Sequence, residues 1–271
     1  MADAKVKTGC AVLLALGLTA CGRDEAVDAV PAPGPVVEAP PSTNPAMPLT
    51  RADLIGGAAA AAGAYAIGTT GGEGDPLVGR SFSVSLPFGC GGPQATEGGI
   101  DGLARAVRQG EAGEGVALSL TPADWTASAL ITGAGADWEA VEGFWIDRIW
   151  LLEDRCPTVR ADPLQIGVAF AEPPSVGLAA VHAEGASRLT RREGRAYRHV
   201  VRATDGAPTQ VPAQGWRLRI EGRITSFPDG RAFRCRAPGP DARPTCVAAV
   251  GIDRVAFETP DGAVLSQWRP G

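Results

Sequence analysis

The sequence predicts a mainly β protein made of two small antiparallel β subdomains, each a sandwich or an OB-like barrel, with one short helix. Two observations predict this fold class. Apolar and polar side chains alternate along several short runs, most clearly in residues 216–224, which is the period of a half-buried strand. Pro-Asp-Gly triplets at residues 228–230 and 260–262 separate pairs of such runs, and this triplet is typical of tight turns. We therefore place the β subdomains at residues 76–190 and 191–271.

A short helix is expected just before the first β subdomain. Thr50 and Asp53 have the spacing of a capping box, in which two side chains satisfy free amides at a helix start. The alanines that follow favour a helix, although each interior glycine costs about 1 kcal/mol relative to alanine. We predict a helix near residues 51–67 that ends at Gly68. The alternative is that the whole Ala/Gly-rich segment 51–75 is a linker.

The first β subdomain is predicted from a series of apolar runs. Residues 81–86 and 115–120 alternate with a period of two. Residues 102–108 are either the hairpin partner of the second run or a single helical turn. Residues 144–152 are apolar on both faces, which is typical of a central strand buried on both sides. Further strands are expected at residues 165–170, 176–181 and 196–201, and a helix or turn start is expected at residues 121–124.

The second β subdomain contains the clearest strand, at residues 216–224. Its two faces differ in chemistry, with Trp216, Leu218, Ile220 and Ile224 on one side and Arg217, Arg219, Glu221 and Arg223 on the other. The first Pro-Asp-Gly turn is expected to fold this strand back onto residues 232–236. The second turn is expected to join residues 255–258 to residues 263–268.

The N-terminal segment carries the most specific motif. Lys5 and Lys7 precede an apolar run at residues 11–18, which ends in Leu18-Thr19-Ala20-Cys21. This segment resembles a bacterial lipoprotein signal, with a charged region, an apolar region and a cysteine that carries lipid. The resemblance implies that residues 1–20 are a signal peptide and that Cys21 is acylated. It places the protein in the cell envelope, and Gly22 after the cysteine favours the periplasmic face of the outer membrane.

Residues 21–50 are predicted to be a tether between the lipid and the folded part. Seven prolines lie between Pro31 and Pro48, and large apolar side chains are few. Such a segment cannot bury enough surface to offset the entropy of ordering it, so we expect an extended chain. No stretch of the sequence reaches the ~20 apolar residues that a membrane-spanning helix needs.

Four cysteines remain beyond the signal and Cys21, and an even number in an exported protein indicates two disulfides. We favour a Cys235–Cys246 bond, because a Pro- and Gly-rich loop between them can turn the chain. That choice leaves Cys90 and Cys156 as the second pair. A zinc site is the alternative, but neither pair has the close spacing of zinc ligands.

Composition and motifs give little support for catalysis. His182 and His199 are the two histidines of the chain, and neither lies in a metal-binding spacing. The sequence contains no nucleophile elbow, phosphate-binding loop or haem-attachment motif. The net charge of −5 gives no global signature of nucleic-acid binding. We therefore expect no metal, no cofactor and no nucleic-acid partner.

Arginines form the first candidate binding surface. Alternation places Arg217, Arg219 and Arg223 on one strand face, and Arg234 and Arg236 can join them across the predicted hairpin. Guanidinium groups bind phosphates and carboxylates through paired hydrogen bonds, so this face could hold an anionic polymer of the envelope. The alternative is a solvated strand face that keeps the sheet soluble.

Aromatic residues form the second candidate surface, and acidic residues lie beside it. Trp138, Trp145 and Trp150 could line a binding groove, although core packing is the more common use of tryptophan. The nearby carboxylates are Asp137, Glu139 and Glu142, and paired carboxylates beside an aromatic platform are what sugar hydrolysis requires.

The sequence therefore predicts a lipid-anchored envelope protein with a non-enzymatic binding or structural role. Its expected partner is an anionic glycan or another envelope protein. The alternative is a periplasmic glycan hydrolase that uses carboxylates among residues 137–142.

Overall fold

The computed structural model describes residues 46–69, 74–96, 98–110, 115–132, 138–159, 173–187, 191–202 and 209–269. Residues 45–271 form one compact unit. The predicted signal peptide, Cys21 and the tether as far as residue 45 lie outside the described residues. The elements are α1 (Arg51–Ala66), β1 (Ser81–Phe88), β2 (Arg105–Gln109), β3 (Gly115–Leu120), β4 (Ala123–Asp124), β5 (Trp138–Trp145), β6 (Val176–Ala183), β7 (Tyr197–Arg202), β8 (Trp216–Ile224), β9 (Phe233–Arg236), β10 (Thr245–Glu258) and β11 (Val264–Trp268).

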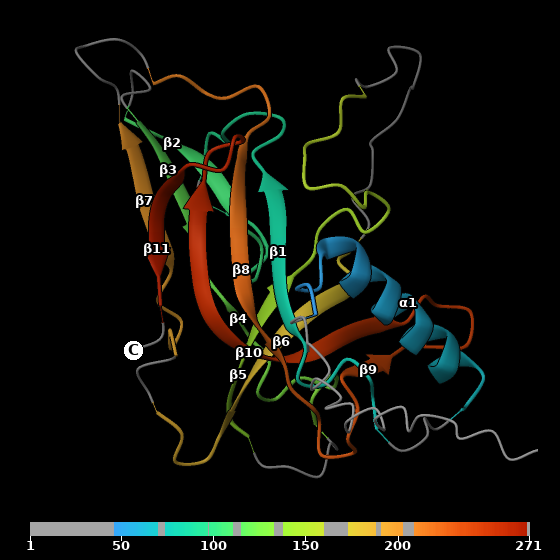
Figure 1. Ribbon diagram of the computed structural model, residues 1–271. Helices are drawn as coiled ribbons and strands as arrows, with labels where there is room; N and C mark the ends of the chain where they lie inside the picture. Colours follow the sequence, from blue (N-terminus) through green and yellow to red (C-terminus); the bar gives the residue numbers. More distant parts are fainter. Residues whose placement is uncertain are drawn as a thin grey trace, which may run out of the picture. The chain divides into compact units, whose positions relative to one another are not determined.

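In the described residues, two β-sheets and one short helix make up the fold, which confirms the predicted fold class. The large sheet has the strand order β1-β8-β10-β6-β5-β4, with β9 and β11 also paired to β10. The small sheet has the order β2-β3-β7 and lies behind the half of the large sheet that contains β1, β8 and β11 (Figure 1). Within the described residues neither sheet closes into a barrel, so the packing is that of a sandwich rather than of the OB-like alternative.

Strand β10 connects the two halves of the large sheet. Its first part pairs in parallel with β6 and antiparallel with β9, and its second part pairs antiparallel with β8 and β11. The strand bends between these parts, where its register with β8 shifts between Ile252 and Arg254 (Figure 1). A Cβ atom at Gly222 would lie 2.1 Å from Gly251 O, so the close approach of β8 and β10 at the bend requires glycine.

The large sheet takes its strands from both sides of residue 190. Strand β8 pairs with β1 along its whole length, and β10 pairs with β6. The border that we expected near residue 190 therefore does not divide the sheet. Long-range pairing of this kind leaves no signal in local alternation, which reports only which side chains share a face.

Helix α1 starts and ends close to the predicted residues. The Thr50 side chain accepts from the Asp53 amide, and the Asp53 carboxylate accepts from the Thr50 amide, which completes the predicted capping box. The helix packs on β9 and the first part of β10. Arg51, the first residue of the helix, is buried, and its guanidinium donates to the backbone oxygens of Leu151 and Arg148. Burial lowers the pKa of Arg51 to about 10, still far above neutrality. No helix in the described residues is long and apolar enough to cross a membrane.

Three sequence expectations for secondary structure are wrong. The run at residues 144–152 is not one strand, because β5 ends at Trp145 and the chain then turns at residues 149–150. Residues 123–124 form the short strand β4 instead of the start of a helix or turn. The first Pro-Asp-Gly segment does turn the chain, but β8 and β9 do not pair with each other, since both pair with β10. The strand expected at residues 165–170 lies outside the described residues.

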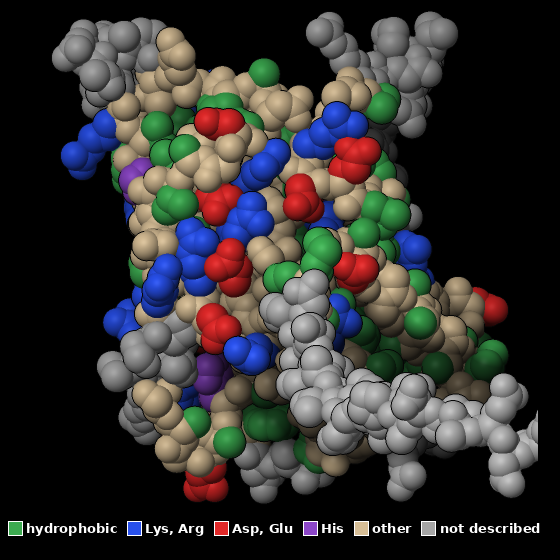
Figure 2. All heavy atoms as spheres, in the orientation of Figure 1, with side chains coloured by type: hydrophobic (Ala, Val, Ile, Leu, Met, Phe, Trp, Pro, Cys, Tyr) green, Lys and Arg blue, Asp and Glu red, His purple; other side chains and the backbone are tan. Residues whose placement is uncertain are grey.

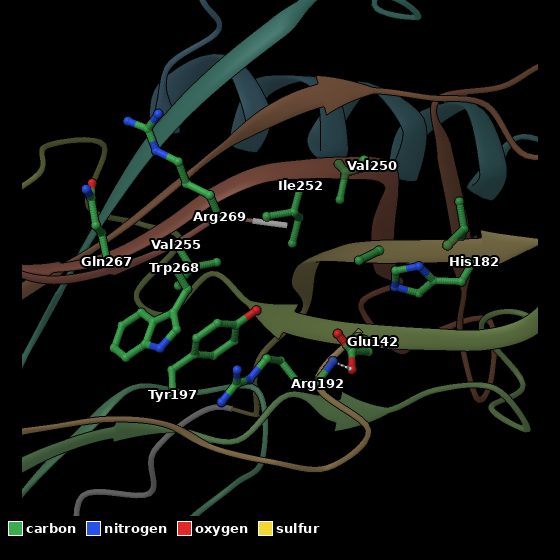
Figure 3. Close-up of a pocket in the computed structure, with 13 residues that line it drawn as sticks. Glu142, His182, Arg192, Tyr197, Val250, Ile252, Val255, Gln267, Trp268 and Arg269 are labelled. Carbon is green, nitrogen blue, oxygen red and sulfur yellow. Dashed lines mark hydrogen bonds between the residues drawn. The ribbon is translucent and has the colours of Figure 1, made fainter. Parts of the chain in front are cut away.

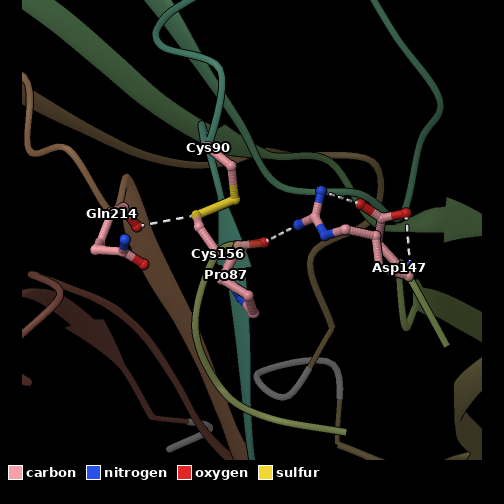
Figure 4. The surroundings of a disulfide bond; sticks show 6 residues. Pro87, Cys90, Asp147, Cys156 and Gln214 are labelled. Carbon is pink, nitrogen blue, oxygen red and sulfur yellow. Dashed lines mark hydrogen bonds and ion pairs between the residues drawn. A yellow bond between two sulfur atoms is a disulfide. The ribbon is translucent and has the colours of Figure 1, made fainter. Parts of the chain in front are cut away.

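Both disulfides form with the predicted pairing. Cys235 and Cys246 face each other across β9 and β10. Cys90 joins Cys156 and ties the glycine-rich turn after β1 to the segment that follows β5 (Figure 4). Beside this bond, Arg148 donates to Pro87 O and pairs with Asp147. These links fix the long loop after β5 across the end of β1.

Candidate functional site

A pocket of about 500 Å³ lies where the two sheets meet, and we call it the seam pocket. Its walls come from β5, β6, β10, β11 and the first residue of β7, together with the turn that precedes β7. Figure 3 shows Tyr197 and Trp268 side by side at one end and His182 at the other, with Glu142 between them. Valine and isoleucine side chains of β10 form the apolar wall, at the point where this strand bends.

Aromatic rings form one end of the seam pocket. The Tyr197 and Trp268 ring centroids are 5.1 Å apart with an edge-on geometry, and Trp268 packs in the same way on Phe257 at 5.5 Å. The Arg192 guanidinium lies over the Tyr197 ring at 4.6 Å. Three side chains from separate strands or turns therefore support one another, and this holds the rings in place for a ligand.

Glu142 is a buried carboxylate in the pocket wall, with only 8% of its surface exposed. Its Oε1 accepts from the backbone amides of Arg192 at 2.6 Å and Glu193 at 2.9 Å. Burial raises the pKa of Glu142, although these two amides and the guanidinium groups of Arg192 and Arg191 lower it. The carboxylate thereby holds the turn that carries Arg192 against the pocket.

Glu139, which does not line the pocket, is a second carboxylate that holds the turn carrying Arg192. Glu139 Oε1 accepts from Arg191 Nη2 at 2.8 Å, and its Oε2 accepts from the Gly185 amide at 3.1 Å. Glu193, at the tip of the turn, has a positive φ of 51°, which is a costly conformation for a residue other than glycine. The carboxylates of β5 accept hydrogen bonds from Arg191, Arg192 and Glu193 itself, and these bonds stabilise the conformation.

His182 and Tyr197, which also line the pocket, are both neutral at pH 7. Burial and the nearby Arg191 guanidinium lower the pKa of His182, so its imidazole is uncharged. Burial and the Glu142 carboxylate raise the pKa of Tyr197, so its hydroxyl keeps its proton. Imidazole and phenol groups can each donate or accept a hydrogen bond. An aromatic end beside such groups suits a ligand with an apolar ring face and several hydroxyls.

In the predicted arginine face, Arg219 is engaged in an internal ion pair. Arg219 Nε donates to both oxygens of Glu258 at 3.1 Å, and its Nη1 donates to Ser83 Oγ at 3.2 Å. Arg254, which the sequence analysis did not single out, pairs with Glu221 at 3.3 Å. Figure 2 shows basic and acidic side chains interspersed over this face. Arg217 and Arg223 share the face, and Arg223 is exposed.

Arg234 and Arg236 lie on β9 and do not extend the β8 face. Strands β8 and β9 pair with different parts of β10, so their outer faces are separated by the bend. Arg234 donates to Ile131 O at 3.1 Å and lies over the Phe227 ring at 5.7 Å. The expectation that these residues join Arg217 across a hairpin is wrong, because that hairpin does not form.

The three predicted tryptophans do not form one platform. Trp138 and Trp145 pack against a buried cluster around Trp125, whose ring centroid lies 4.5 Å from that of Trp145. Trp150 lies on the loop after β5 and is 66% exposed. Tyr197 and Trp268, which form the aromatic pair of the seam pocket, lie on β7 and β11, and both strands are far from these tryptophans in the sequence.

Of the predicted acidic residues, Glu142 lines the seam pocket and Glu139 binds the Arg191 side chain next to it. Asp137 lies outside the described residues. Among the described residues Glu142 is the single carboxylate in the pocket lining. No group of three or more histidine, cysteine or acidic side chains in the described part of the chain could hold a metal ion.

Sequence reasoning missed His182, Arg192, Tyr197 and Trp268 as members of a site. Register brings Glu142 opposite Ala180 and His182 opposite Ala140, so Glu142 and His182 lie on the same face two positions apart. Without the pairing of β5 and β6, nothing in the sequence links them. Comparison of the chain with protein-family models, curated proteins and solved structures finds no match.

Proposed function

We propose that the chain is a lipid-anchored protein of the bacterial cell envelope whose seam pocket binds a unit of an anionic glycan. The observation that supports a glycan as the ligand is the pairing of Tyr197 and Trp268 at one end of a pocket lined by Glu142 and His182. Sugar rings present an apolar face that packs on aromatic rings, and their hydroxyls donate to carboxylate and imidazole groups. Two disulfides support an oxidising compartment.

The anionic character of the ligand follows from the residues at the aromatic end. Arg269 is exposed and lines the pocket beside Trp268, and Arg192 lines it beside Tyr197. An exposed guanidinium next to a stacked sugar ring can pair with a carboxylate or phosphate substituent on that ring. Glu142 is shielded by its two amide partners, so it does not oppose an anion at the mouth.

A binding measurement with purified protein tests this function. Titration calorimetry with acidic envelope oligosaccharides and their neutral counterparts should show binding of the acidic chains. Trp268→Ala should weaken this binding about tenfold, since a stacked ring is worth about 1 kcal/mol or more. Trp150→Ala is the matched control, because Trp150 does not line the seam pocket. Equal affinity of both variants, or no binding of any acidic chain by the wild type, would contradict the proposal.

A second candidate function is hydrolysis of the same glycan. Glu142 would be its general acid, since this carboxylate lines a pocket and burial raises its pKa, but the described lining holds no second carboxylate, so binding is the better-supported function. Glu142→Gln should then abolish release of reducing ends and leave glycan affinity within a few-fold of the wild type. A wild type that binds the chains and releases no product identifies the protein as a binding module alone.

A further inference from the structure

The flank of the molecule around α1 carries an apolar surface that no described element covers. A groove of about 410 Å³ runs between α1 and the loop after β5, lined by Ile55, Ala59, Ala62 and Trp150. Trp150 is 66% exposed, and Leu152 next to it is 54% exposed. Large exposed apolar surfaces of this kind mark interaction sites.

Further exposed apolar side chains lie at both ends of α1. Met47 precedes the helix, and Ile67 caps its end; both are largely exposed. The loop is held to the first turn of the helix, because buried Arg51 donates to Leu151 O at 3.0 Å. We call the surface formed by Met47, α1, Ile67, Trp150 and Leu152 the α1 face.

The chain enters the compact unit at this same face. Residues 46–50 lead directly into α1, and Leu49 pairs with Phe82 at the edge of β1. If Cys21 is lipidated, 24 residues separate the lipid-bearing residue from residue 46. A Pro-rich segment of that length, extended as predicted, spans roughly 75 Å at about 3.1 Å per residue, so the α1 face can reach the bilayer surface.

We propose that the α1 face docks on the surface of the bilayer that holds the lipid anchor, with the Trp150 indole at the level of the lipid head groups. The proposal rests on the lipid-anchored function proposed above. Tryptophan is enriched at membrane–water interfaces, where its ring is half apolar and half polar. Arg243 also lines the groove, and a guanidinium at this position suits anionic head groups. Since the anchor supplies a high local concentration, weak docking by a few side chains is enough.

Brominated lipids provide the direct test, because bromine quenches tryptophan fluorescence only at close range. The lipidated protein is reconstituted into phosphatidylethanolamine and phosphatidylglycerol vesicles with brominated acyl chains. The wild type should lose more fluorescence than Trp150→Phe, whereas Trp268→Phe should be quenched as strongly as the wild type. Equal quenching of the wild type and Trp150→Phe would overturn the proposal. A dimer that buries the α1 face and that Trp150→Glu dissociates would overturn it as well.

A second measurement separates this proposal from the lipid anchor itself. Cys21→Ser protein carries no lipid, so its sedimentation with the same vesicles reports the α1 face alone. We expect weak binding that Trp150→Glu reduces about tenfold, because a charge replaces an apolar contact. Binding that is the same with and without Trp150→Glu would refute the docking face. Loss of membrane attachment in Cys21→Ser cells, by contrast, concerns only the anchor.

Discussion

Individual charged side chains decide which surfaces of this protein are available to a ligand. Arg219 belongs to the face that the sequence marks as basic, yet its guanidinium donates to Glu258 and Ser83. Glu142 is equally committed, since its carboxylate binds two backbone amides of the turn beside the pocket. Both side chains stabilise the fold through these hydrogen bonds. The sequence does not reveal this role, because the partners are 39 to 136 residues away along the chain.

Removal of the Arg219 guanidinium should destabilise the fold. Glu258 has 4% of its side chain exposed, so Arg219→Gln leaves a buried carboxylate with only a distant contact to Arg254 at 3.9 Å. We expect a loss of about 2 kcal/mol in the free energy of unfolding, measured by urea denaturation. Arg223→Gln, on the same strand face but exposed, is the matched control and should change stability by less than about 0.5 kcal/mol. Equal effects of both changes would show that the Arg219 pair does not matter for folding.

The pH dependence of stability should contain a contribution from Glu142. Burial raises the pKa of Glu142 above its ordinary value of 4.5, so the folded state binds its proton more tightly than the unfolded state does. Stability from this group is therefore present below pH 4.5 and is lost as the pH rises through the raised pKa. Glu142→Gln cannot titrate and keeps an oxygen that accepts from both amides. The free energy of unfolding of this variant should fall less than that of the wild type between pH 4.5 and 7. If the free energies of unfolding of the two proteins change in parallel with pH, the raised pKa is contradicted.

Secondary-structure elements were predictable where local chemistry alone decides them. The bounds of β8 agree with the predicted strand because its alternation is strict, and α1 follows its capping box. The end of β5 was missed because Trp150 and Leu152 are apolar but exposed, and apolar side chains indicate burial only on average. The parallel pairing of β6 with β10 depends on contacts across about 70 residues of sequence, which local patterns do not record.

Two glycines of α1 offer a test at the scale of the element. A Cβ at Gly63 meets no atom within 4 Å, whereas a Cβ at Gly57 would lie 2.9 Å from the Phe233 ring. Gly63→Ala should stabilise the protein by up to about 1 kcal/mol through helix propensity alone. Gly57→Ala should gain less or destabilise, because the ring of Phe233 must move. Thermal unfolding of both variants checks this order, and a larger gain at Gly57 would mean that α1 does not pack on β9 as described.

At the scale of the whole molecule, the candidate site exists only because the two sheets meet at β7 and β11, beside the bend of β10. The seam pocket combines β5, β6, β10 and β11 of the large sheet with the first residue of β7 from the small sheet. Tyr197 and Trp268 lie on different sheets and meet through a contact between their rings. The sequence indicated Glu142 by its chemistry, but the residues around it could not be assembled without the order of the strands.

The disulfides, the glycan ligand and the docking face all depend on one claim, which is that the protein is located in the cell envelope. Intact-mass spectrometry of the protein extracted from membranes tests it most directly. We predict a polypeptide that begins at Cys21, carries acyl chains there, and has no free thiol at Cys90, Cys156, Cys235 or Cys246. A mass that corresponds to an uncleaved chain starting at Met1, with those four thiols free, would contradict the account.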